Sequence, residues 1–155
     1  MAKPLDFVRL GSSFKGLMAR AVGEFDRYME DEAGKYRWVM VESPERIAHS
    51  LEILAEDLPE ESLARVVPKM PYLFLLFRHH DMEPVIPVEA TLAFLSTINQ
   101  SGMITIMRQC SDRDQLAASF DLDVNQWNPL VFMIAGIPDL DKVHEGDAPG
   151  HCHFF

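Results

Sequence analysis

Apolar side chains recur at three- and four-residue steps near the start of the chain. The positions that share this spacing are Phe14, Leu17, Met18, Ala21, Val22, Phe25, Tyr28 and Met29. Such a period places them along one face of an amphipathic helix. Ser12 or Ser13 suits the helix start, and Gly34 suits its end. The pattern therefore predicts a helix from Ser12 to Ala33.

Four short apolar segments lack a helical period: 36–42, 72–77, 103–107 and 130–134. The first is rich in aromatic and β-branched residues, which favours a strand. The other three are so short that a buried strand and a buried helical turn remain alternatives. We predict an α+β, helix-rich single domain in which all four form a small sheet. An all-α bundle is the alternative.

Helix signals separate these segments. Ser43-Pro44-Glu45 has the composition of a helix start, and Pro59 begins a second, short helix. Pro87 begins another, with Leu92, Leu95 and Ile98 as its apolar face and Gly102 after its end, and residues 111–114 open one more that runs to Phe120. No repeat or linker interrupts the chain, so residues 1–155 are predicted to be one globular domain. Residues 138–155 read as a loop-like tail.

Charge narrows the classes of partner. The net charge of −10 divides into +1 for residues 1–40, −6 for 41–90 and −5 for 91–155. The acidic part repels nucleic acid and anionic lipid, so neither is an expected partner. A protein with a basic face fits better. The nearly neutral first helix is a candidate for self-association, which makes a homo-oligomer an open alternative.

The cysteines and the hydropathy bear on location. Cys110 and Cys152 form no disulfide framework and no paired zinc motif. The N-terminus has no apolar leader segment, and the longest apolar run, 72–77, is far shorter than the roughly 20 residues of a membrane span. We therefore expect a soluble protein of the cytoplasm.

Side chains that ligate metals gather in two histidine-rich tracts. Their members are His79, His80 and Asp81 in the first, and His144, His151, Cys152 and His153 in the second. Imidazole, thiolate and carboxylate bind zinc, nickel, copper and iron. If the tail folds back, the tracts would form one site. The competing interpretations are a solvated tail and a polar loop with a local histidine–carboxylate hydrogen bond. A divalent transition metal is the one cofactor that the sequence suggests.

Catalytic motifs are missing from the sequence. It has no Gly-x-Ser-x-Gly elbow, no glycine-rich phosphate loop and no HExxH zinc motif. Bulky residues at Trp38, Phe74, Phe77 and Trp127 indicate either core packing or, less strongly, a small-molecule pocket. We predict an acidic cytoplasmic accessory protein that acts through protein–protein interaction. The alternative is a metal-binding protein or metal-dependent enzyme that uses the two tracts.

Overall fold

The computed structural model describes residues 7–8, 14–54, 72–110 and 114–138. Helices and strands alternate along the chain, which confirms the prediction of an α+β domain. The elements are β1 (Phe7–Val8), α1 (Phe14–Met29), η2 (Glu30–Lys35), β2 (Tyr36–Val41), α2 (Pro44–Ile53), β3 (Tyr72–His79), α4 (Val88–Gln100), β4 (Ile104–Gln109), α5 (Asp114–Ser119) and β5 (Trp127–Pro138). The short helix predicted at Pro59 and the tail 138–155 lie, apart from Pro138, outside the described residues.

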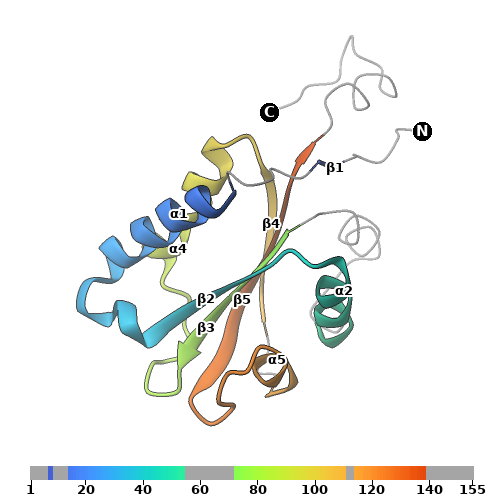
Figure 1. Ribbon diagram of the computed structural model, residues 1–155. Coiled ribbons are helices and arrows are strands. Elements are labelled where there is room, and N and C mark those ends of the chain that lie inside the picture. Colours follow the sequence, from blue (N-terminus) through green and yellow to red (C-terminus); the bar gives the residue numbers. More distant parts are fainter. Residues whose placement is uncertain (1–6, 9–13, 55–71, 111–113, 139–155) are drawn as a thin grey trace.

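An antiparallel sheet forms the centre of the molecule (Figure 1). The long strand β5 pairs with both β3 and β4. Strand β2 pairs with the edge of β3 that faces away from β5. The short β1 adds to the far end of β5, where Phe7 lies opposite Pro138. All four apolar segments are thus strands, and β5 extends well beyond the predicted 130–134.

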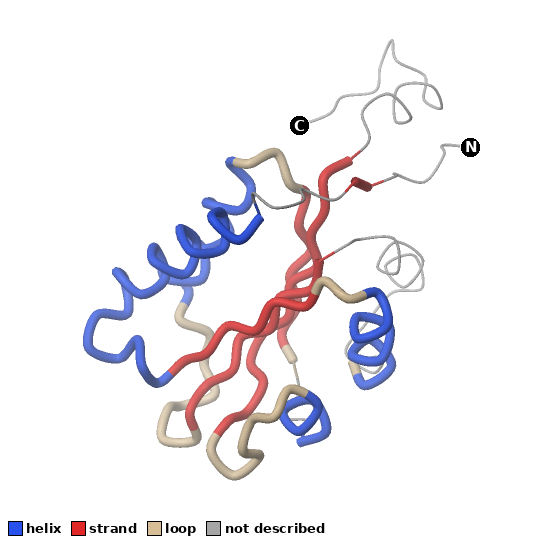
Figure 2. The backbone as a smooth tube through the Cα atoms, in the orientation of Figure 1, coloured by secondary structure: helices blue, strands red, loops and turns tan. Residues whose placement is uncertain are grey.

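Helices cover both faces of this sheet (Figure 2). Phe74 and Leu76 of β3 belong to the core beneath α1 and α4, whereas Leu75 and Phe77 belong to the core beneath α2 and α5. Side chains of a strand alternate between faces, so a strand buried on both faces is apolar at every position. This burial is why the sequence of β3 shows no period of two.

The two helices of one layer, α1 and α4, lie side by side (Figure 1). The buried face of α4 consists of Ala90, Thr91, Phe94 and Ile98. Leu92 was predicted to be part of the apolar face, but it is 50% exposed. The prediction was wrong because the four-residue repeat of positions 90, 94 and 98 faces the sheet, which turns position 92 outward.

Helix α1 ends earlier than predicted. It ends at Met29, and the chain continues as the 3₁₀ helix η2 as far as Lys35. Glu30, rather than Gly34, takes the left-handed backbone conformation that breaks the α-helix, with φ of 54°. None of the helices in the described part of the chain has the length and apolar character that crossing a bilayer requires.

Candidate functional site

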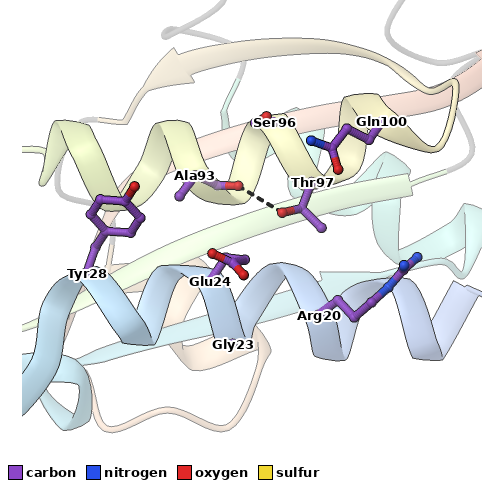
Figure 3. A pocket seen from close by; sticks show the side chains of 8 residues that line it. All are labelled: Arg20, Gly23, Glu24, Tyr28, Ala93, Ser96, Thr97 and Gln100. Atoms are coloured by element: carbon purple, nitrogen blue, oxygen red, sulfur yellow. Dashed lines mark hydrogen bonds between the residues drawn. The ribbon is translucent and has the colours of Figure 1, made fainter.

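A groove of about 500 Å³ runs between α1 and α4 on the side away from the sheet (Figure 3). Its volume lies within the range of small-molecule sites. The residues that line it come equally from the two helices: Arg20, Gly23, Glu24 and Tyr28 from α1, and Ala93, Ser96, Thr97 and Gln100 from α4. This site was not predicted from the sequence, because its lining is the outer, polar face of two amphipathic helices.

Small residues keep the middle of the groove open. Gly23 lies across from Ala93, and a Cβ atom added to Gly23 would have no other atom within 4 Å. Glycine inside a helix lowers its stability by roughly 0.5–1 kcal/mol relative to alanine. The open space at Gly23 therefore belongs to the groove and not to close packing of the helices.

Different chemistry marks the two ends of the groove. Arg20 lies toward one end and the half-exposed ring of Tyr28 toward the other (Figure 3). Eight residues along a helix separate them by roughly 12 Å. Glu24 lies between them and forms an ion pair with Arg27 at 3.0 Å. Because Glu24 disfavours an anion in the middle, an anionic group would bind at the Arg20 end.

The α4 side of the groove supplies hydrogen-bonding groups. Thr97 Oγ1 donates a hydrogen bond to the carbonyl oxygen of Ala93 at 3.0 Å, which leaves the lone pairs of this hydroxyl for a ligand. Ser96 and Gln100 are exposed beside it. The groove thus combines a cation, an aromatic ring and several polar groups in a line, an arrangement suited to an elongated molecule with one anionic end.

The first histidine-rich tract forms a compact cluster at the end of β3. One ligand atom from each of His79, His80 and Asp81 lies within 4.8 Å of the others. Lys35 Nζ donates a hydrogen bond to Asp81 Oδ2 at 3.0 Å, and this bond lowers the pKa of the Asp81 carboxyl. The structure therefore brings together the three predicted residues of this tract.

The second tract, His144, His151, Cys152 and His153, lies outside the described residues. A site built from both tracts therefore stays a prediction. His49, the remaining histidine, is exposed on α2. Cys110 is buried, as expected for a thiol at the end of an apolar run.

The pocket suggested by Trp38, Phe74, Phe77 and Trp127 does not form. Phe74 and Phe77 are fully buried on opposite faces of β3, so they cannot line one cavity. Trp38 stacks on Phe94 within the core of the α1–α4 layer. The alternative that the sequence analysis favoured, core packing, accounts for Phe74, Phe77 and Trp38.

Solved structures share this fold. A nitroreductase family protein from Clostridium novyi NT has a TM-score of 0.64 at 12% identity, covering 90% of this chain and 82% of that one. An FMN-dependent nitroreductase from Clostridium difficile R20291 reaches 0.66 at 9%, covering 99% and 92%. Iodotyrosine deiodinase bound to FMN and 3-iodo-L-tyrosine reaches 0.61 at 13%, covering 89% and 86%. No family model and no curated protein matches the sequence. At these identities the likeness establishes a nitroreductase-like fold.

This likeness corrects our functional prediction. We expected an accessory protein that works by protein binding, with metal binding as the alternative. The structures with this fold are instead described as nitroreductases, an FMN-containing oxidoreductase and a deiodinase bound to FMN. The prediction was wrong because it rested on the absence of contiguous catalytic motifs from the sequence. A binding groove formed by residues of two separate helices leaves no such motif.

Proposed function

We propose that this protein is an FMN-dependent oxidoreductase that binds its cofactor in the groove between α1 and α4. The observation that carries the proposal is the fold shared with an FMN-dependent nitroreductase over 99% of the chain and with a deiodinase bound to FMN over 89%. The groove adds support, because it offers a cation for the phosphate at one end and an aromatic ring for the flat ring system at the other. The carboxylate of Glu24 lies between them, where the uncharged ribityl chain of FMN would pass.

Each groove residue has a distinct task in this proposal. A bound flavin supplies two-electron transfer between a reduced nicotinamide and an organic acceptor. Arg20 holds the phosphate, Tyr28 provides a surface for the flat ring, and Gly23 leaves space for the cofactor. Ser96 and Gln100 orient the cofactor through hydrogen bonds. These residues lie on helices, so the positions of their side chains are largely set before the cofactor binds.

A cytoplasmic location belongs to the same proposal. It rests on the cysteine content of the sequence, since Cys110 and Cys152 provide no disulfide framework.

Reconstitution tests the proposed function. The purified chain is incubated with FMN, freed of unbound flavin by gel filtration, and assayed for oxidation of NADH and NADPH with a nitroaromatic or quinone acceptor. We expect about one flavin per chain and turnover well above that of the same concentration of free FMN. Retention of no flavin would overturn the proposal, whereas retained flavin without turnover would reject the acceptor classes tested.

A further inference from the structure

We propose that His79, His80 and Asp81 form a divalent transition-metal site of the zinc-binding type, in addition to the proposed flavin site. The three residues occupy the end of β3 and the turn that follows it. None of them lines the groove between α1 and α4. The proposal therefore does not depend on flavin binding.

The spacing of the three side chains matches a metal coordination shell. His79 Nδ1 and His80 Nδ1 are 3.4 Å apart; His79 Nδ1 lies 3.2 Å from Asp81 Oδ2, and His80 Nδ1 lies 3.4 Å from Asp81 Oδ1. Ligand atoms bound tetrahedrally at about 2.0–2.1 Å from zinc are separated by about 3.3–3.4 Å. The two ring nitrogens and the carboxylate therefore lie close to the mutual spacing of zinc ligands, and water would complete the shell.

The hydrogen bonding of His79 is also compatible with a metal ion. The backbone N–H of Asp81 donates to His79 Nδ1 at 3.2 Å, so in this arrangement the nitrogen acts as an acceptor. An ion bound at His79 Nδ1 would take the place of this N–H as the partner of the lone pair. Zinc accepts imidazole nitrogen and carboxylate oxygen, the two kinds of ligand atom that meet here.

Neighbouring groups hold each ligand in place. The ring of His79 lies edge-on to Trp127, with centroids 5.3 Å apart. The backbone N–H of His80 donates to the carbonyl oxygen of Gln126 at 2.8 Å. Lys35 Nζ donates a hydrogen bond to Asp81 Oδ2 at 3.0 Å, which fixes the carboxylate beside the two rings. Such orienting contacts are typical of metal sites and reduce the entropy lost on binding.

Calorimetric titration with Zn²⁺ tests the site in the full-length chain. Because the tail also carries ligand-type residues, the reference protein has His144, His151 and His153 replaced by alanine and Cys152 by serine. The exposed His49 offers a matched control in the variant His49→Gln. We expect one Zn²⁺ per chain in the reference protein and in the control. His80→Gln and Asp81→Asn should each weaken binding at least tenfold.

Two further readouts separate metal ligation from a structural role. The visible absorption of Co²⁺ should show four-coordinate geometry in the reference protein and lose it in His80→Gln. The urea midpoint and the FMN affinity of His80→Gln should remain those of the reference protein. A reference protein that binds no Zn²⁺, or one whose affinity survives both ligand substitutions, would overturn the proposal. Since these outcomes do not involve flavin, they are distinct from failure of the proposed function.

Discussion

The ring of Trp38 on β2 lies parallel to the ring of Phe94 on α4, with centroids 3.8 Å apart and an angle of 4° between the planes. Phe94 is fully buried and also meets the edge of Phe74 at 5.8 Å. These contacts anchor α4, and with it one wall of the groove, to the sheet. Replacing Phe94 by alanine should lower the free energy of unfolding by about 3–5 kcal/mol, because it leaves a cavity.

Urea denaturation measures this loss. Leu95→Ala is the control on the same helix, since Leu95 is only partly buried against the same core. We expect the control to lose clearly less stability than Phe94→Ala. Equal losses in the two variants would show that the stacked pair is not the main anchor of α4.

Gly23 offers a test in which stability and binding change in opposite directions. A Cβ at this position meets no other atom, so Gly23→Ala should stabilise α1 by about 0.5–1 kcal/mol. The added methyl group enters the groove, and the bulkier Gly23→Leu fills it. We therefore expect weaker FMN binding in the first variant and its loss in the second, as measured by quenching of flavin fluorescence.

Gly16 is the matched control for this substitution. It lies in the same helix, a Cβ there also meets no atom within 4 Å, and it does not line the groove. Gly16→Ala should raise stability without changing FMN affinity. If both alanine variants bind FMN like the unmodified chain, and Gly23→Leu does too, the cofactor does not occupy this groove.

Ionisation of Tyr36 should reduce the stability of the folded chain at alkaline pH. Burial, reinforced by the nearby Glu32, raises the pKa of the Tyr36 phenol above its ordinary value of 10.0. The folded state then holds this proton more tightly than the unfolded state. The stabilisation that this protonated phenol contributes is fully present below pH 10 and is lost as the pH rises through the folded-state pKa. In Tyr36→Phe, the decline in the free energy of unfolding above pH 10 should be shallower. An unchanged slope would contradict this assignment.

The fold was largely predictable from local patterns. The amphipathic stripe of α1, the start of α2 at Pro44 and the strand at 36–41 follow directly from spacing and residue type. The runs at 72–77, 103–107 and 130–134 remained ambiguous between strand and helix. The first and the last belong to β3 and β5, and a strand covered by helices on both faces loses its alternation. Leu92 was misplaced because apolar residues occupy more than one face of α4.

The two candidate sites differed in how far the sequence revealed them. His79, His80 and Asp81 are adjacent in sequence, so their residue types alone indicated a cluster. The groove joins Arg20 of α1 to Gln100 of α4, positions far apart in sequence whose types are ordinary for exposed helix faces. Gly23 interrupts the helix pattern, but Gly16 of the same helix does so too and does not line the groove, so neither glycine marked the site. The predicted partner with a basic face and the homo-oligomer stay predictions.

In the proposed site, Arg20 holds the phosphate of FMN in the groove between α1 and α4. Riboflavin has the same ring system without the phosphate, so titrating both flavins separates the contribution of this group. In Arg20→Ala we expect FMN affinity to fall about fivefold, since an ion pair at an exposed site is worth up to roughly 1 kcal/mol. Riboflavin affinity should not change. Lys15→Ala, an exposed cation of the same helix outside the groove, should leave both affinities unchanged. Equal FMN affinity in Arg20→Ala and the unmodified chain would contradict the account.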